Sequence, residues 1–384
     1  MLTKFIPPTK HIKEFLKSLA FLEEKIINTF SKIIKSYLTA EELRISSIAS
    51  AMTSIYRNRN GSKTKHSDAD YKVIQRFLDK IEISTLKDIL KRIISEKAPF
   101  IIIDPTEIIR KEAYKTPYVG ILSDGKTRGF LLISASIPYK GRALPCFYNI
   151  YSSKTIKEES SSRNIEHYKV IAELKDLVGD KPLVFDREFS YEELLTCMIE
   201  LDMRWVIRLN TGNRVTITDS EGNKITLSIA IKEKKIWKDV YYKGKVKVNL
   251  VGFWKMGMKD PIYVITNMEP DEALKIYLSR MKIDESYRDE KNMLKIKKVM
   301  NKDRDNLEKM IGIALISYLI GLLVGEELRD LAYKGREWLR YSGLFVLLRK
   351  AGEISNEKKE LAVKRALEVL RTLVGIKEET ARSP

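Results

Sequence analysis

Hydrophobic residues along the first part of the chain recur at helical spacing. This periodicity covers four stretches, residues 12–38, 40–56, 68–78 and 85–94. The second and third stretches flank a short basic segment, RNRNGSKTKHS, at residues 57–67. Helices around a basic loop are typical of a helical DNA-binding module, so we predict such a domain over residues 1–95.

From residue 98 the pattern becomes that of strands. Two continuous apolar runs, residues 100–103 and 183–185, resemble fully buried strands, and each is followed by an aspartate. The Asp124-Gly125 pair between alternating stretches predicts a hairpin. The expected elements are strands 100–103, 118–123, 130–135 and 144–151, helix 165–178, strand 183–185, helix 191–201 and strand 205–209.

The remaining sequence predicts a β-rich segment followed by helices. Short strands with turns occupy residues 210–259, an apolar strand follows at 261–266, and later helices are expected at 277–298, 307–328, 335–350 and 358–374. The fold class is therefore α/β. We divide the chain into residues 1–95, a core in two parts (96–210 and 261–350), a β-rich insertion (211–260) and a C-terminal helix with tail (351–384).

The predicted helix over residues 277–298 has an unusual polar face. It contains no Gly or Pro, and an apolar stripe on one side would bury it against a core. The neighbouring face, within about 80° on a helical wheel, combines one acid with an aromatic residue and cations. Its members include Tyr277, Arg280, Asp284, Arg288 and Lys291.

Composition narrows the partners. The 384-residue chain has a formal net charge of +18, which favours a polyanionic partner, above all nucleic acid. The most apolar stretch, residues 310–325, is shorter than the ~20 residues needed to cross a bilayer and is bounded by Lys309 and Glu326. We interpret it as a buried core helix and expect no membrane association.

Cysteine and histidine are too sparse for several kinds of site. The chain has two cysteines and three scattered histidines. This excludes a disulfide scaffold and a cysteine zinc site, shows no histidine-based metal cluster or triad, and fits a reducing cytoplasm.

Carboxylates are the remaining candidates for chemistry. Asp104 and Asp186 each follow a buried strand, where function gathers in α/β sheets, and Asp284 is a third acid amid cations. Three converging carboxylates suit hard cations such as Mg²⁺ or Mn²⁺. On a basic protein they predict two-metal chemistry on a phosphodiester, with Arg280 and Lys291 holding phosphates.

The chain resembles DDE-type transposases of prokaryotic insertion sequences, in the branch with a Tyr-x2-Arg-x3-Glu-x6-Lys signature. Tyr277, Arg280, Asp284 and Lys291 match the signature spacing. VFDREF around Asp186, followed by WVIRLN, resembles the second strand-end motif of the family, and IIIDPTEI with the later YKGRALP resembles the first. The resemblance covers about residues 40–350.

This resemblance implies a ribonuclease H-like catalytic core carrying a β-rich insertion. Asp104, Asp186 and Asp284 would form the metal-binding catalytic triad with two Mg²⁺ or Mn²⁺ ions, while Tyr277, Arg280 and Lys291 contact transposon-end DNA. The implied activity is cut-and-paste transposition. The enzyme would bind terminal inverted repeats in double-stranded DNA, cleave by metal-assisted hydrolysis with a hairpin on the excised end, and transfer the 3′-hydroxyl strand into target DNA. The resemblance also implies a homodimeric synaptic complex in the prokaryotic cytoplasm, at the nucleoid.

One residue departs from the signature. The family has Glu where this chain has Asp284, which is one methylene shorter, and Glu285 beside it is an alternate third ligand. Further candidates for DNA contact are Arg187, Arg288 and Trp254, the last as an aromatic that stacks on a flipped base.

Other interpretations stay open. Arg142 suits either a phosphate contact or a turn cap. A catalytically inactive or domesticated DNA-binding descendant of a transposase is the main alternative to the enzyme. A phosphatase using Asp104 in a DPT motif ranks last, because Thr106 stands where a second aspartate is expected.

Overall fold

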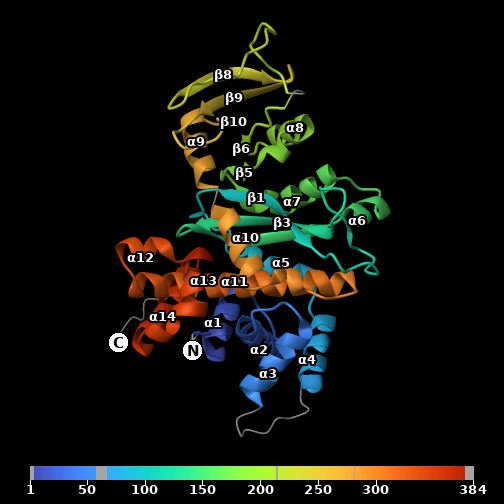
Figure 1. The fold of residues 1–384 in the computed structure, drawn as a ribbon, viewed down its shortest axis with the longest axis vertical. Coiled ribbons are helices and arrows are strands. Elements are labelled where there is room, and N and C mark those ends of the chain that lie inside the picture. Colours follow the sequence, from blue (N-terminus) through green and yellow to red (C-terminus); the bar gives the residue numbers. More distant parts are fainter. Residues whose placement is uncertain (1–3, 58–66, 213–214, 281, 377–384) are drawn as a thin grey trace.

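The computed structural model describes residues 4–57, 67–212, 215–280 and 282–376 (Figure 1). Most of the predicted basic loop and the predicted C-terminal tail lie outside the described residues. The chain folds around a mixed ten-stranded sheet covered by helices, which confirms the α/β prediction.

The sheet combines antiparallel and parallel strands. Its order is β2-β3-β1-β5-β6-β10-β9-β8-β7, and β4 also pairs with β3. β3 lies antiparallel to both β1 and β4, whereas β5 lies parallel to β1 and β6 parallel to β5. The strands are β1 Ile101–Ile109, β2 Gly120–Ile121, β3 Arg128–Tyr139, β4 Arg142–Tyr151, β5 Leu183–Phe185, β6 Trp205–Arg208, β7 Ile217–Thr218, β8 Lys234–Tyr242, β9 Val246–Phe253 and β10 Ile262–Thr266.

The predicted end of the first strand at Asp104 is wrong. β1 continues to Ile109 because residues after Asp104 keep pairing with β3, from Asp104 opposite Ser134 to Ile109 opposite Gly129. On its other side, pairing with β5 covers only Ile101 to Ile103. Asp104 therefore lies in the middle of a strand and, at the same time, just past the end of the parallel ladder.

The β-rich segment predicted for residues 211–260 extends this same sheet. β10 pairs with β6 on one side and β9 on the other, and β8 and β7 follow (Figure 1). β8 and β9 therefore form an arm that begins at the edge of the parallel strands.

Helices pack on both sides of this sheet and form a separate layer below it (Figure 1). The predicted stretch 12–38 is divided, because backbone at Ala20 is extended between the first two helices. The helices are α1 Thr9–Leu19, α2 Glu24–Ala40, α3 Ile45–Tyr56, α4 Ser67–Lys80, α5 Ile83–Lys91, α6 Ser153–Glu158, α7 Arg163–Val178, α8 Glu192–Glu200, α9 Pro270–Ser279, α10 Lys282–Asn292, α11 Arg304–Ala332, α12 Gly335–Arg340, α13 Gly343–Phe345 and α14 Asn356–Leu373.

The prediction of one helix over residues 277–298 is also wrong. α9 ends at Ser279, α10 runs from Lys282 to Asn292, and a short 3₁₀ turn at Ile296–Lys298 follows a left-handed Lys295. Helical propensity is a weak guide where tertiary contacts form, and Arg280, just after α9, donates to Asp104 Oδ1 at 2.7 Å.

α11 is the buried core helix that the sequence predicts. It runs between the sheet and the N-terminal helices (orange in Figure 1), and its side chains join both to one hydrophobic cluster. It is long and apolar enough to cross a membrane, yet 94% of its apolar window is buried inside the protein. Such burial is what the core helix of a soluble protein shows.

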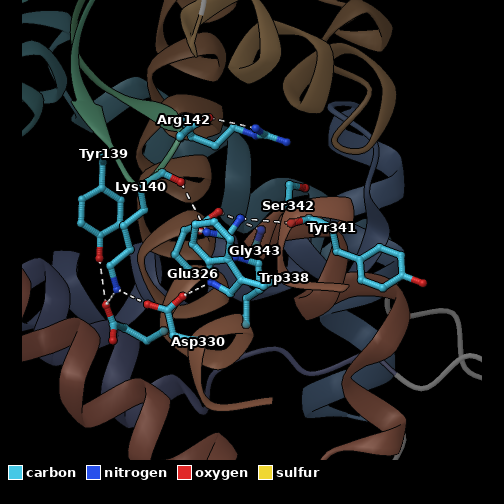
Figure 2. A network of polar contacts seen from close by, with 12 residues as sticks. Tyr139, Lys140, Arg142, Glu326, Asp330, Trp338, Tyr341, Ser342 and Gly343 are labelled. Carbon is cyan, nitrogen blue, oxygen red and sulfur yellow. Dashed lines mark hydrogen bonds and ion pairs between the residues drawn. The ribbon is translucent and has the colours of Figure 1, made fainter. Parts of the chain in front are cut away.

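A polar network fixes the C-terminal end of α11 (Figure 2). The Gly343 N–H donates to Glu326 at 2.8 Å, and Arg329 donates to the carbonyl of Tyr341 at 3.0 Å. The backbones of α11 and α13 touch here, because a Cβ on Gly325 would clash with the carbonyl of Gly343. Only glycine fits at this crossing.

Replacing Gly325 with Ala is expected to lower the free energy of unfolding by roughly 2 to 4 kcal/mol, since two backbones must separate. Gly321→Ala, one turn earlier, is the matched control. Its Cβ would meet the side-chain atom Leu344 Cδ1 at 3.2 Å, so its cost should stay below about 1 kcal/mol. Urea denaturation of both variants checks this. Equal stability of the two variants would contradict the proposed backbone contact.

Candidate active site

A cleft of about 700 Å³ lies where the pairing between β1 and β5 ends. It combines four acids with four cations and several apolar side chains. Its lining consists of Asp104, Pro105, Asp186, Arg187, Glu188, Arg208, Phe253, Lys255, Met258, Ile262, Tyr277, Leu278, Arg280 and Asp284.

Strand register brings the first acids together. Ile103 pairs with Phe185, and Phe185 pairs with Ile207, so Asp104, Asp186 and Arg208 follow at one edge of the sheet. Side chains at the carboxyl ends of parallel strands are well placed for chemistry. The edge is thus set by hydrogen bonds of the sheet.

Arg280 lies at the centre of the three predicted catalytic acids. One of its terminal nitrogens, Nη2, is 2.7 Å from Asp104 Oδ1 and 3.7 Å from Asp186 Oδ2. The other, Nη1, is 4.0 Å from Asp284 Oδ2. Arg280 is only 5% exposed, so these carboxylates surround a buried positive charge. Three segments far apart in sequence therefore meet at one guanidinium.

The buried carboxyl of Asp104 is strongly perturbed. Burial raises its pKa to about 7, Arg280 opposes that rise, and the charges of Asp186 and Asp284 add to it. Burial and like charges both disfavour a carboxylate, whereas a nearby cation favours it. The site therefore holds more negative charge than its burial favours, and a cation among the acids relieves it.

The other signature residues also face inward. Tyr277 Oη donates to Asp186 Oδ1 at 3.4 Å, and burial raises the pKa of this phenol to about 12. Lys291 Nζ donates to Thr106 Oγ1 at 2.6 Å, and burial lowers the pKa of this amine. Thr106 follows Asp104 on β1 with one residue between them. Tyr277 and Lys291 thus tie α9 and α10 to the edge that carries the acids.

The two candidates for the third ligand have different surroundings. Asp284 lines the cleft with its side chain 54% exposed. Glu285 instead pairs with Arg142, with 2.5 Å between Oε2 and Nη1. Arg142 also lies 3.2 Å from Asp289 through Nε, so it anchors α10 to the start of β4. Of the two, Asp284 is the side chain that reaches the cleft.

The three further DNA-contact candidates are placed differently. Arg187 lines the cleft, and Arg288 is exposed on α10. Trp254 is half-buried beside the cleft, where its Nε1 donates to the carbonyl of Met258 at 3.1 Å. Only Arg187 among them is part of the lining.

Three charged lining residues, Glu188, Arg208 and Lys255, were absent from the sequence prediction. Burial raises the pKa of Glu188, and Arg163 lies 3.4 Å from its carboxylate. Arg208 ends β6 beside Asp186, so its position as the last residue of a neighbouring parallel strand is a usable signal. Lys255 follows β9, and pairing between β9 and β10 has no local signature in the sequence.

The donor chemistry of this site fits a hard divalent cation. Asp104, Asp186 and Asp284 offer only oxygen atoms, and all three already face one positive group, Arg280. As the side chains stand, no three acidic, histidine or cysteine residues within the described parts of the chain are grouped closely enough to hold a metal ion. In the described structure Arg280 is the cation that lies among these three acids.

Neither a scan against protein-family models nor a search of curated proteins finds a match to this chain.

The inner face of α10 contains a second perturbed acid, Glu290. Ser286 on this face accepts a hydrogen bond from the Ala143 N–H at 2.8 Å. Glu290 is 4% exposed, and burial, with Asp289 adding to it, raises its pKa from 4.5 to about 8. Between pH 4.5 and about 8, Glu290 therefore keeps its proton in the folded state and releases it in the unfolded state.

Glu290→Gln is expected to raise the free energy of unfolding by about 4 kcal/mol near pH 8, because glutamine has no proton to lose. The pKa of Glu290 is higher in the folded state, so the wild type loses stability as pH rises from 4.5 to about 8. The two proteins should converge near pH 4. Chemical denaturation across this range checks the prediction, with exposed Glu368→Gln as the control. A difference independent of pH would contradict it.

Proposed function

We propose that this protein is a DDE-type DNA transposase, a metal-dependent endonuclease and strand transferase. The observation that carries the proposal is the convergence of Asp104, Asp186 and Asp284 around one guanidinium in a cleft. These acids come from β1, the end of β5 and α10. Arg187, Arg208 and Lys255 add positive charge to the same cleft, as a phosphodiester substrate requires.

The strand order supports a ribonuclease H-like core. β4, β3, β1, β5 and β6 are adjacent in that order, with an antiparallel meander followed by two parallel strands reached through α7 and α8. This is the arrangement that the family resemblance implies. The arm of β8 and β9 occupies the position of the implied β-rich insertion, between that core and α9.

In this proposal Asp104, Asp186 and Asp284 hold Mg²⁺ or Mn²⁺. Two bound ions would supply activation of water or a 3′-hydroxyl and stabilisation of the leaving oxygen. Arg187, Arg208 and Lys255 hold the phosphates of the scissile strand. When a phosphate binds Arg280, it replaces Asp104 as the partner of the guanidinium. This exchange frees the carboxylate of Asp104. The buried setting of Asp104 excludes water from that side of the reaction centre.

The partners follow from the same chemistry. The net charge of +18 fits double-stranded DNA, namely terminal inverted repeats and a target. Joining two ends requires two active sites, so the working form is proposed as a homodimer in a synaptic complex.

Asp186→Ala is expected to reduce metal-dependent cleavage more than about a hundredfold, because one of the three proposed metal ligands is lost. The substrate is a supercoiled plasmid carrying the DNA that flanks this gene on both sides, with Mg²⁺ or Mn²⁺ added. Conversion to nicked and linear forms is measured on a gel, and binding of the same DNA is measured without metal.

Asp176→Ala is the matched control, since this aspartate is exposed on α7 and does not line the cleft. It should cleave like the wild type, while Asp186→Ala should retain DNA binding. Full cleavage by Asp186→Ala would rule out the triad.

The alternative is a transposase-derived DNA-binding protein without catalysis. Two observations favour it: Arg280 occupies the space between the acids, and Asp284 reaches the guanidinium only at 4.0 Å. A ligand one methylene longer extends about 1.5 Å further into the cleft.

Asp284→Glu separates the two proposals. If the enzyme is active but limited by this short side chain, the variant should cleave the flanked plasmid at least about tenfold faster than wild type. If wild type and variant both fail to nick DNA with either metal while binding it, the non-catalytic function is the correct one. Glu285→Gln serves as the control and should leave cleavage unchanged, because Glu285 pairs with Arg142.

A further inference from the structure

A second, strongly basic groove lies at the far end of β1. It has a volume of about 390 Å³, and its charged lining is Arg44, Arg110, Lys111, Glu112, Lys297 and Lys298. Arg44 precedes α3, Arg110 to Glu112 follow β1, and the two lysines belong to the 3₁₀ turn after α10. Three separate segments thus contribute five cations against one carboxylate.

The two arginines in this groove have unused hydrogen-bond donors. Arg44 Nε and Arg110 Nη1 are buried, and neither has a hydrogen-bond partner among the described residues. Burial lowers the pKa of Arg110, and the charge of Arg44 adds to this effect. The nearest carboxylate to Arg44 is Glu42, 3.5 Å from Nη2. Like charges with unsatisfied donors cost free energy, and an anion in the groove would offset that cost.

The groove is aligned with the cleft. Arg110 lies six residues beyond Asp104, so at about 3.3 Å per residue β1 separates the two sites by about 20 Å. α10 follows the same direction, because Asp284 lines the cleft, Lys291 contacts Thr106, and Lys297 lines the groove. About six base pairs of duplex DNA span this distance.

We propose that the groove of Arg44, Arg110, Lys111, Lys297 and Lys298 binds the phosphate backbone of duplex DNA about six base pairs from the cleft. The guanidinium groups of Arg44 and Arg110, which line the groove, donate to one phosphate, and the exposed lysines add charge on either side. Met300 and Ile109, 59% and 46% exposed in the same groove, offer apolar contacts to the deoxyribose. The inference shares with the proposed function only the premise that the partner is DNA.

The test measures DNA binding alone. Fluorescence anisotropy with a duplex of roughly 30 base pairs of arbitrary sequence, without divalent metal, gives Kd as a function of salt. Lys297→Ala combined with Lys298→Ala should weaken binding about tenfold near 0.1 M salt and reduce the slope of log K against log salt by about 2. Arg110→Gln should reduce that slope by about 1.

The matched control is Lys358→Ala combined with Lys364→Ala on α14. Both lysines are exposed, and the variant has the same net charge as the groove variant. Unchanged affinity and slope in the groove variant, or an equal loss in the control, would overturn the groove while leaving the cleft chemistry standing. Absence of any DNA binding by the unaltered protein would instead overturn the proposed function.

Discussion

The buried ion pair between Arg280 and Asp104 is the interaction on which the rest of the site depends. Burying either charge alone costs several kcal/mol, and the cost is offset only when the partner and its hydrogen bonds are present. Arg280 has such partners, since it faces Asp104, Asp186 and Asp284 at 2.7, 3.7 and 4.0 Å, and its buried Nε alone has no hydrogen-bond partner among the described residues. Without a cation there, three acids from separate segments would repel one another, most strongly at the buried Asp104.

Arg280, which follows α9, and Lys291 on α10 both contact β1, at Asp104 and at Thr106. α10 is then held by other contacts: Tyr287 Oη donates to the carbonyl of Asp104 at 2.6 Å, and Arg142 pairs with Glu285 and Asp289. Support for the site therefore comes from the backbone of β1 and the start of β4.

Local patterns in the sequence were sufficient for part of this arrangement. The LVF run and Asp186 after it predict β5 and its end, because a short apolar run between polar segments has few other structures. These local patterns could not show that β1 continues past Asp104, because that continuation depends on pairing with β3. They also could not show that Arg280 is buried, because its burial depends on acids about 100 and 180 residues away in the sequence. The signature spacing located Asp284, whose side chain lines the cleft together with Tyr277 and Arg280.

Position on α10 couples the cleft to the rest of the basic surface. Asp284 and Lys291 are seven residues apart, which is two helical turns and about 10 Å. Asp284 is half exposed and has only a long contact with Arg280, whereas Lys291 is anchored to Thr106. In the proposed function, a phosphate that draws Arg280 away from Asp104 would weaken the contact holding Asp284, while Lys291 keeps the other end of α10 in place. Asp284 is the least restrained of the three acids, so under that proposal it is the acid whose position bound DNA would adjust.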